Sequence, residues 1–386
     1  MNLSMYFPTQ RYYRVGVSVF FFLQGLTFST WASRIPDIKS LLQLTDAGLG
    51  AVLFALPVGQ FSAMALSGYL VSRFGSKKTL TAAALLYPAG LVLLGTVTTV
   101  WQLAAGLFFF GICGNLSNIS VNTQGVGVER LYRRSIMASF HGLWSLAGFI
   151  GGLISSFMVA DHISPFTHFC IIYLITFVLM LLARPYILPR DANHGKAAGG
   201  KLFVKPDSYI IKLGFIAFAS MICEGTMFDW SGIYFETVVH APVELTRMGF
   251  VAFMTTMSGG RFAADWLVTK FGVKRILQTS GVVIVTGMSL AVAIPDITFA
   301  TVGFLLIGLG VSSVVPLAYS LAGKSTTMVP GLALAAVSSI GFLGFLLGPP
   351  LIGFIAEVLS LRWSFILVAL LGLGTTLLAG KIKMRS

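Results

Sequence analysis

The chain has 386 residues, of which 56% are hydrophobic and only 10% are charged, with a net charge of +13 and a mean hydropathy of +0.88. A soluble globular domain carries about 25% charged residues, so this composition excludes a protein whose whole surface faces water. Long apolar runs follow one another with little polar sequence between them, which also excludes the two or three soluble domains that the length alone suggests.

Twelve apolar runs are each long enough to cross the hydrocarbon core of a bilayer. About 20 residues of helix span ~30 Å, and a helix satisfies its own backbone hydrogen bonds in lipid, whereas an open strand does not. The first run has full spanning length and no A-x-A cleavage site, so we expect it to be retained. The sequence predicts an all-α integral membrane protein with twelve transmembrane helices, at about 14–33, 48–71, 79–98, 101–124, 135–159, 165–187, 209–235, 246–268, 274–294, 298–322, 330–356 and 363–380.

Basic residues are distributed unevenly over the segments that connect these helices. If the N-terminus is cytoplasmic, the inside segments hold 21 of the 26 lysines and arginines, the outside segments hold four, and Arg261 lies within a helix. The positive-inside rule then predicts cytoplasmic termini in a bacterial-type inner (plasma) membrane. Because the positive charge lies on several short loops rather than on one face, we expect no nucleic-acid partner.

Polar side chains within the first two helices are candidates for contact with a solute. Gln24 lies about 15 Å into the first helix, and Gln60 lies in the second. Trp31 precedes Arg34 at the predicted outer surface, so we expect it to be an interfacial aromatic residue.

Two loops of the chain repeat one another. GYLVSRFGSKK at 68–78 aligns with DWLVTKFGVKR at 265–275, with five of eleven positions identical. The polar segment at 188–208 has the Gly, Ala, Lys and Pro content of an exposed linker, and it divides the twelve runs into six and six. We therefore predict a duplicated organisation with these parts: an N-terminal six-helix bundle at 1–187, a cytoplasmic linker at 188–208 and a C-terminal six-helix bundle at 209–386.

The first of these loops resembles the signature of the major facilitator superfamily, roughly G-x-L-[A/S]-D-R-x-G-[R/K]-[R/K], with Ser72 at the position of the usual Asp. Segments 118–130, 140–152 and 341–353 are similar to the fucose-permease-like branch. The resemblance implies two pseudo-symmetric six-helix bundles that enclose a central cavity and open it alternately to each side. We expect a conformational latch in the cytoplasmic loops, formed by Gly68, Arg73, Gly75, Lys77, Lys78, Arg261, Asp265, Lys270 and Gly272.

The fourth and fifth helices carry polar residues on single faces. Asn115, Asn118 and Asn122 lie within about 60° of one another, roughly 12 to 22 Å above the inner surface. Amides donate to and accept from hydroxyl groups, so we predict that these three line the cavity; bonding to a neighbouring helix is the alternative. His141 and Trp144 share a face of the fifth helix, and the family resemblance favours a solute contact for His141 over a core histidine.

The seventh helix carries Glu224, 12 residues past Lys212 and thus roughly 18 Å from the inner surface. An ionisable group at this depth is expected to face a cavity, where the carboxyl can take up and release a proton as the cavity alternates. A structural carboxyl bonded to another helix is the alternative. Asp229 points about 140° away from Glu224, and we expect it to assist proton coupling or an outer gate, with Trp230 as a further solute contact.

The eighth helix carries Arg261 and Asp265, four residues apart on one face, a spacing that suits an ion pair. We place this pair near the cytoplasmic side and expect no solute contact there.

No chemical motif supports an enzyme. The sequence contains no G-x-x-x-x-G-K-[S/T] nucleotide loop, no H-E-x-x-H and no G-x-S-x-G. Cys113, Cys170 and Cys223 fall inside apolar runs without metal-ligand spacing, so we expect no disulfide, no metal and no cofactor.

These observations predict a secondary active transporter of a small polar organic solute, a sugar or sugar-like metabolite, by proton-coupled symport with alternating access. The expected partners are the solute, a proton or other coupling ion, and membrane lipid, and the protein is expected to be a monomer. An exporter of drugs or metabolites with the same fold is one alternative, and a non-transporting membrane sensor or scaffold is the other.

Overall fold

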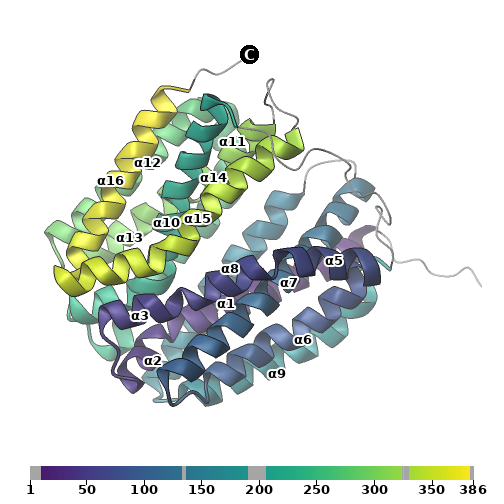
Figure 1. The fold of residues 1–386 in the computed structure, drawn as a ribbon, viewed down its shortest axis with the longest axis horizontal. Coiled ribbons are helices and arrows are strands. Elements are labelled where there is room, and N and C mark those ends of the chain that lie inside the picture. Colours follow the sequence, from purple (N-terminus) through teal and green to yellow (C-terminus); the bar gives the residue numbers. More distant parts are fainter. Residues whose placement is uncertain (1–9, 133–135, 190–205, 324, 326–329, 383–386) are drawn as a thin grey trace, which may run out of the picture.

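The computed structural model describes residues 10–132, 136–189, 206–323, 325 and 330–382, and every regular element in these ranges is helical (Figure 1). The N-terminal helices are α1 Gln10–Ser33, α2 Ile35–Leu41, α3 Asp46–Leu53, α4 Ala55–Ser62, α5 Met64–Phe74, α6 Ser76–Leu94, α7 Val100–Tyr132, α8 Met137–Ala160, α9 Pro165–Ala183 and η1 Arg184–Tyr186. The C-terminal helices are α10 Ser208–Thr237, η2 Val243–Leu245, α11 Met248–Phe271, α12 Val273–Ala293, α13 Ile297–Val311, α14 Val314–Gly323, α15 Pro330–Val358 and α16 Leu361–Gly380.

Figure 1 shows the N-terminal helices, purple to blue, beside the C-terminal helices, teal to yellow. The chain reverses direction between successive long helices, so the molecule has two ends. We call one end the α2 end, because it carries α2 and the turn at 161–164. We call the other the linker end, because it carries Gly75, Gly272 and the chain on both sides of the 190–205 segment. That segment, most of the predicted linker, lies outside the described residues, and the predicted domain bounds stay a prediction.

The described chain contains eleven helices that are long and apolar enough to cross a bilayer. They correspond to eleven of the twelve predicted runs. The twelfth is α11, whose 24 residues are long enough but whose apolar character is interrupted by Arg261, Asp265 and Lys270. The structure thus agrees with the prediction of an all-α membrane protein, and α11 is a long helix whose apolar stretch is interrupted by charged residues.

The runs predicted as single helices at 48–71 and 298–322 are broken in the structure. The first consists of α3, α4 and α5, and the second consists of α13 and α14. Pro57 lies three residues after the break at Phe54, and Pro316 lies just after the break at Ser312–Ser313. A proline has no N–H for the carbonyl one turn earlier, which explains why the helical bonding is interrupted at these positions.

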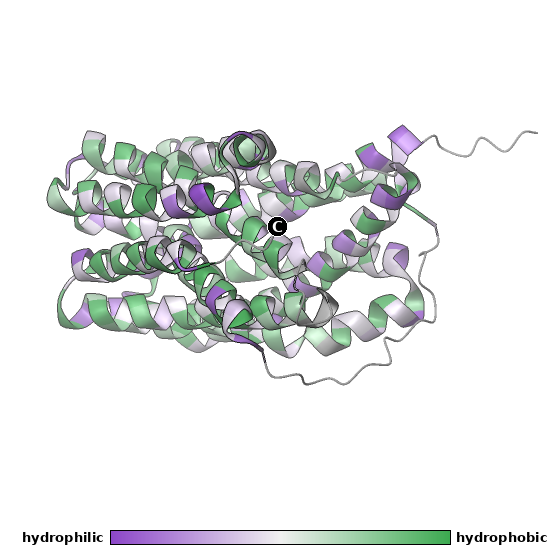
Figure 2. Cartoon of the chain, turned by 90° about the horizontal axis from the view of Figure 1, so that it is seen from above, coloured by the Kyte–Doolittle hydropathy of each residue, from purple (hydrophilic) through white to green (hydrophobic). Residues whose placement is uncertain are grey.

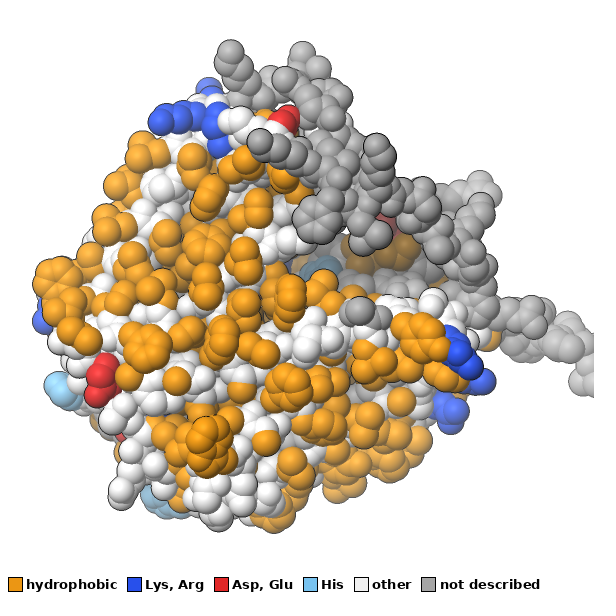
Figure 3. All heavy atoms as spheres, viewed as in Figure 1, with side chains coloured by type: hydrophobic (Ala, Val, Ile, Leu, Met, Phe, Trp, Pro, Cys, Tyr) orange, Lys and Arg blue, Asp and Glu red, His pale blue; other side chains and the backbone are white. Residues whose placement is uncertain are grey.

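The surface along the helices is apolar. Trp101 is 85% exposed, Phe157 is 72% exposed and Leu182 is 64% exposed, which soluble proteins rarely allow in contiguous patches. Figure 2 shows apolar residues along most of the helix length, and Figure 3 shows hydrophobic side chains across the visible face with Lys and Arg near its margins. This distribution suits contact with lipid tails along the helices and with water at the ends.

The two groups of helices contact each other closely at the α2 end. There α3 packs against α15, and the crossing point is formed by Gly50 and Gly353. A Cβ on Gly353 would lie 2.6 Å from the Asp46 carbonyl oxygen and 2.9 Å from the Gly50 Cα. Side chains at this crossing would push the two groups apart, because the atoms they would meet belong to the backbone.

A second contact between the groups joins α8 to α11. Gly148 and Gly152 of α8 lie against Met254 and Phe250 of α11, and a Cβ on Gly148 would lie 2.1 Å from the Met254 methyl carbon. Gly148 and Gly152 therefore form part of a close contact between the two groups of helices.

The repeated loops adopt the same backbone conformation. Gly75 joins α5 to α6 with φ 83° and ψ 149°, and Gly272 joins α11 to α12 with φ 81° and ψ 150°. Only glycine adopts this conformation without strain, which explains why both copies of the loop keep it.

We predict that Gly353→Ala weakens closure of the α2 end by ~1–3 kcal/mol, the usual cost of overpacking a close contact. The measurement is disulfide cross-linking between Ala47→Cys and Glu357→Cys, since the Ala47 N–H donates to Glu357 Oε2 at 3.1 Å across the same boundary. In a background without the native cysteines, the yield should fall in Gly353→Ala.

Gly374→Ala is the matched control, because a Cβ on Gly374 of α16 would have no neighbour within 4 Å. It should leave the cross-linking yield unchanged. An unchanged yield in Gly353→Ala would mean that the Gly50–Gly353 crossing does not limit closure.

Candidate functional site

The midsection of the molecule holds an ion pair that joins the two groups of helices. Arg261 of α11 donates from Nη2 to Glu224 Oε1 of α10 at 3.2 Å. The same guanidinium donates from Nη1 to Ser145 Oγ of α8 at 2.6 Å. Arg261 is thus held by its own group through Glu224 and by the N-terminal helices through Ser145.

The ion pair is largely buried but incompletely bonded. The Arg261 and Glu224 side chains are 16% and 12% exposed. Arg261 Nε is buried and has no hydrogen-bond partner among the described residues. Charges in a low-dielectric interior attract strongly, but they also lose their hydration, so a single direct hydrogen bond leaves such a pair easy to exchange for another partner.

Two fifth-helix residues from the sequence prediction lie beside this pair. The Arg261 guanidinium carbon lies 5.9 Å from the centroid of the Trp144 ring, within the range of a cation–π contact. His141 is exposed, contacts the edge of Phe21 with ring centroids 5.3 Å apart and lies within electrostatic range of Arg261. The ion pair, Trp144 and His141 therefore form one continuous polar and aromatic surface, here called the central site.

An aromatic cluster packs beside the central site. Phe228 of α10 lies at its middle, with ring centroids 5.1 Å from Phe28 and 6.1 Å from Trp144. Phe250 and Phe253 of α11 complete the cluster at 6.3 Å and 5.7 Å from Phe228. Phe28 and Phe228 are 7% and 3% exposed, so the packed rings leave little room for water between α1, α8, α10 and α11.

The surface is hollowed between the two groups of helices. Figure 3 shows a hollow beyond the N-terminal part of α15, on the side of the linker end. The exposed positions of His141 and of Asn118 on α7 suit side chains that face an open space. Asn122 donates to the Asn118 carbonyl oxygen at 2.8 Å and to its side-chain oxygen at 3.3 Å. Within the described part of the chain, no hydrogen bond links Asn115, Asn118 or Asn122 to another helix.

The other predicted contact residues have more enclosed positions. Gln24 is buried in α1 at 8% exposure, and Gln60 is half-buried in α4. Trp230 is fully buried in the core of the C-terminal helices, and its Nε1 has no partner among the described residues. Asp229 is half-buried without a partner in the described chain. Trp31 is 1% exposed and packs against Phe110, so the prediction of an interfacial position for Trp31 is wrong.

Apart from Arg261, the latch residues whose contacts the structure describes lie against their own group of helices. Arg73 donates to the Tyr69 hydroxyl at 2.6 Å, and Lys77 donates to the Ile187 carbonyl at 3.4 Å. Lys270 lies 5.0 Å from the centroid of the Trp266 ring. Gly68 and Lys78 are exposed. The latch therefore stays a prediction for a conformation in which the linker end is closed.

Arg261 lies deeper than the sequence suggested. Ten residues separate it from Phe271, the last residue of α11, which corresponds to ~15 Å of helix. Its described partners are Glu224 and Ser145, and the side chain of Asp265 lies outside the described residues. The structure therefore places Arg261 in the central site rather than near the end of α11, and the expectation that no solute contacts Arg261 stays a prediction.

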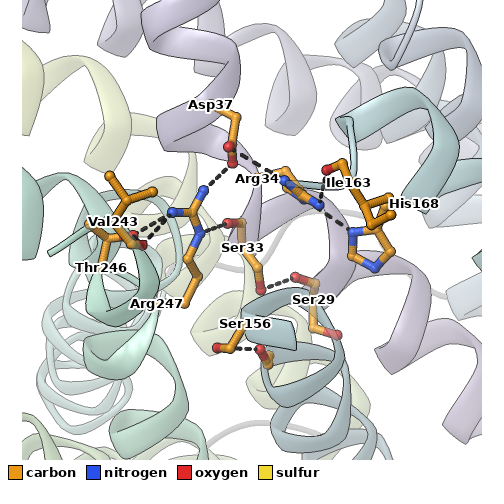
Figure 4. Close-up of polar contacts among 11 residues, drawn as sticks. Ser29, Ser33, Arg34, Asp37, Ser156, Ile163, His168, Val243, Thr246 and Arg247 are labelled. Atoms are coloured by element: carbon orange, nitrogen blue, oxygen red, sulfur yellow. Dashed lines mark hydrogen bonds and ion pairs between the residues drawn. The ribbon is translucent and has the colours of Figure 1, made fainter. Parts of the chain in front are cut away.

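A second polar cluster closes the α2 end (Figure 4). This α2-end cluster consists of Arg34, Asp37, His168, Thr246 and Arg247. Asp37 of α2 accepts from Arg34 at 3.4 Å through one oxygen and from Arg247 through the other. Arg247 comes from the C-terminal group, just before α11, so the carboxylate joins the two groups of helices.

Both arginines of the α2-end cluster are almost completely buried, at 1% and 2% exposure for Arg34 and Arg247. Arg34 also donates to His168 Nδ1 at 3.1 Å and to the Ile163 carbonyl at 2.8 Å. Arg247 donates across the boundary to the Ser33 carbonyl at 3.2 Å. Buried charges with several hydrogen bonds lose much energy when one partner is removed, so this cluster stabilises the closed α2 end.

Sequence reasoning missed the α2-end cluster and Ser145. In the predicted topology, Arg34 and Arg247 are simply two of the outside-loop charges. Two signals were available in the sequence. Basic residues are scarce in the predicted outside segments, which hold four, and an acidic residue follows Arg34 by three positions. The pairing of Asp37 with Arg247 joins residues 210 positions apart, so no local pattern predicts it.

The sequence profile of the Major Facilitator Superfamily matches residues 17–329 and 250–384 of this chain. The chain belongs to the Major Facilitator Superfamily. It is therefore a multi-pass secondary transporter of a small solute and not an enzyme, as the sequence predicted. The predicted all-α fold of this superfamily is confirmed.

Relatives and solved structures agree with this assignment. The chain is 32% identical over 358 residues to an uncharacterized MFS-type transporter of Yersinia pestis, covering 93% of this chain and 92% of the relative. It is 29% identical over 372 residues to the membrane protein MosC of Rhizobium meliloti, covering 95% and 89%. Both relatives are bacterial.

Two solved structures share the fold along nearly the whole chain. A mutant form of the nucleoside transporter NupG superposes with a TM-score of 0.77 at 13% identity, covering 96% of this chain and 99% of that one. A bacterial homologue of the human lysosomal transporter Spinster, in an inward-facing and occupied conformation, superposes with a TM-score of 0.71 at 13% identity, covering 97% of each chain.

We predict that Asp37→Asn opens the α2 end. The substitution removes the charge that two buried arginines share, and a hydrogen bond to a charged group contributes about 1.5–3 kcal/mol, or about tenfold or more in the closed population. The measurement is labelling of Ser33→Cys, a position that is 3% exposed, by a membrane-impermeant maleimide. Its rate should rise by about that factor.

Asp46→Asn is the control, because Asp46 pairs with Lys39 at 2.6 Å within the N-terminal helices alone. The control should label as slowly as the parent. Equal rates for Asp37→Asn and the parent would show that the α2-end cluster does not hold the two groups together.

Proposed function

We propose that the protein takes up a small polar organic solute, a sugar or sugar-like metabolite, together with protons. The observation that carries this proposal is the Glu224–Arg261 pair, which belongs to the C-terminal helices and is bonded to the N-terminal helices through Ser145. A titratable group at this position is in contact with the moving boundary, as coupling between a proton and alternating access requires.

The distribution of basic residues indicates to which side of the membrane the described conformation opens. The linker end is the end that carries most of the basic residues in the predicted topology, so the positive-inside rule assigns it to the cytoplasm. The α2-end cluster then faces the outside, in an inner (plasma) membrane. On this assignment the hollow in Figure 3 lies on the cytoplasmic side, and we propose that the described conformation is inward-open. The likeness in fold to a Spinster homologue described as inward-facing supports this reading.

Solute recognition is assigned to the surfaces around the hollow. Asn118 and Asn122 offer amide groups that donate to and accept from hydroxyls. Trp144 offers the aromatic face that sugar-like rings pack against, and His141 adds a polar edge beside it. Asn115 Oδ1 is buried without a hydrogen-bond partner in the described chain, which suits an acceptor that a solute satisfies.

The coupling cycle uses the central site and the α2-end cluster in turn. Opening to the outside requires the Arg247–Asp37 contact and the aromatic cluster to separate, while the linker end closes. Protonation of Glu224 weakens its attraction to Arg261, so the boundary that Arg261 and Ser145 hold is free to rearrange. We assign a supporting proton role to Asp229 and propose that the protein works as a monomer, in the fucose-permease-like branch that its motifs resemble.

We predict that Glu224→Gln abolishes accumulation driven by a pH gradient and spares solute counterflow. The amide keeps the shape and the hydrogen bond to Arg261 but cannot exchange a proton. The measurement is uptake of a radiolabelled solute into proteoliposomes under an imposed pH gradient, followed by exchange without a gradient.

Asp161→Asn serves as the control, since Asp161 is exposed beyond the end of α8. It should accumulate solute at the parent rate. Accumulation that survives in Glu224→Gln would exclude Glu224 as the coupling carboxyl. Saturable binding without flux would favour a sensor, and pH-driven efflux would favour an exporter of the same fold.

A further inference from the structure

The central site has a charge balance that depends on a single proton. Glu224 interacts with one charged partner, Arg261, and no other described Asp, Glu, Lys, Arg or His side chain contributes to its charge environment. The pair is neutral as a whole while Glu224 is ionised. Once Glu224 is protonated, the central site holds one uncompensated positive charge on Arg261, which a low-dielectric interior tolerates poorly.

We propose that the transported solute is an organic monoanion, whose carboxylate binds Arg261 in exchange for Glu224 when Glu224 is protonated. This inference rests on the proposed function and specifies the solute class of that same site. It narrows the sugar-like metabolite to one that carries a single carboxylate, of the sugar-acid or hydroxy-acid type.

The chemistry of Arg261 suits this exchange. A guanidinium has five N–H donors arranged as a planar fork that matches the two oxygens of a carboxylate. The described contacts use Nη1 for Ser145 and Nη2 for one oxygen of Glu224, and Nε is buried without a partner. Glu224 therefore holds Arg261 through one bond where a two-oxygen contact is available, so a carboxylate that approaches the free edge of the fork gains a hydrogen bond.

The same balance argues against the other charge classes of solute. A neutral solute does not compensate the positive charge that Arg261 carries once Glu224 is protonated, so it gains no charge attraction in the protonated state. A cationic solute that binds Glu224 adds its charge to that of Arg261, with one carboxylate for two cations. A monoanion with one proton restores neutrality, and its hydroxyls remain free for Asn118 and Asn122.

The other titratable groups near the pair are few. His141 of α8 lies within electrostatic range of Arg261. Tyr319 of α14 hydrogen-bonds with Ser338 and lies within electrostatic range of Glu224, as does Cys223 on the same helix as Glu224. Of these three groups, His141 is the one whose side chain ordinarily titrates near neutral pH in water, so its contribution must be separated from that of Glu224 by experiment.

The exchange fixes the stoichiometry that transport should show. One proton enters with one monoanion, so the loaded carrier moves no net charge. Uptake should respond to a pH gradient and be insensitive to an imposed membrane potential. A proton-coupled carrier of a neutral solute would instead move one charge per cycle and respond to both.

The binding experiment uses three solutes that share one ring: glucuronate as the anion, glucose as the neutral analogue and glucosamine as the cation. Lactate and gluconate extend the carboxylate series in size. Purified full-length protein in weakly buffered detergent is mixed with each solute, and binding is followed by thermal stabilisation and proton uptake by a pH indicator. We expect stabilisation by at least one carboxylate, with uptake of about one proton per anion bound, and none by glucose or glucosamine.

Because anion binding is coupled to proton uptake, each variant should give a distinct combination of anion affinity and proton uptake. In the parent, the Kd for the anion should rise about tenfold per pH unit once Glu224 is ionised in the free protein, because each anion bound then takes up one proton. Glu224→Gln should bind the anion without proton uptake and without this pH dependence. Arg261→Gln should lose anion binding, and Arg261→Lys should retain part of it. His141→Gln should keep the parent's proton uptake, which would assign the proton to Glu224.

Several outcomes would overturn the inference. In the binding measurement, these are stabilisation by glucose or glucosamine but by no carboxylate, and no response to any of the three carboxylates. In the proton measurement, they are anion binding without proton uptake in the parent, and unchanged proton uptake in Glu224→Gln. Failure of the proposed function has a different signature. In that case the anion binds with proton uptake, but proteoliposomes show no flux. Coupled flux of a neutral solute would keep the proposed function and reject the anion.

Discussion

A positive charge that lies deep between lipid-embedded helices must be neutralised, and this requirement organises the middle of the molecule. Arg261 meets it through Glu224, while a second hydrogen bond to Ser145 carries the same guanidinium across to the N-terminal helices. The ion pair and the contact between the two groups share one side chain. We therefore propose that protonation of Glu224 changes how firmly the two groups are held, which would link the central site to the movement of the helices.

The contacts between the two groups differ at the two ends, and the difference defines the conformation. At the α2 end, backbone approaches backbone at Gly50 and Gly353, and two buried arginines share the Asp37 carboxylate. At the linker end, the described partners of Arg73 and Lys77 belong to the N-terminal helices. The closed end therefore depends on a few polar bonds and glycine contacts, which are separable without disturbing the apolar core within each group.

The lipid environment explains both the apolar exterior and the exceptions to it. Helices with exposed Trp101 and Phe157 need no polar surface along their length. α11 tolerates Arg261 because it packs against α8, α10 and α13 rather than facing lipid along its whole circumference. The breaks near Pro57 and Pro316 lie within helices whose neighbours cover them, which is where irregular backbone is tolerated in a membrane protein.

Hydropathy, charge and glycine patterns act locally along the chain, so they predict the helical class, the number and approximate bounds of the spans and the repeated loops. They also indicated Glu224 and Trp144, since a carboxyl and an indole at that depth stand out in an apolar helix. The packing of the folded chain was needed to show that Arg261 pairs with Glu224, that Trp31 is buried, and that Asp37 joins Arg247 from 210 positions away. These facts depend on which helix faces are turned toward one another, and side-chain packing between distant segments settles that where no local pattern can.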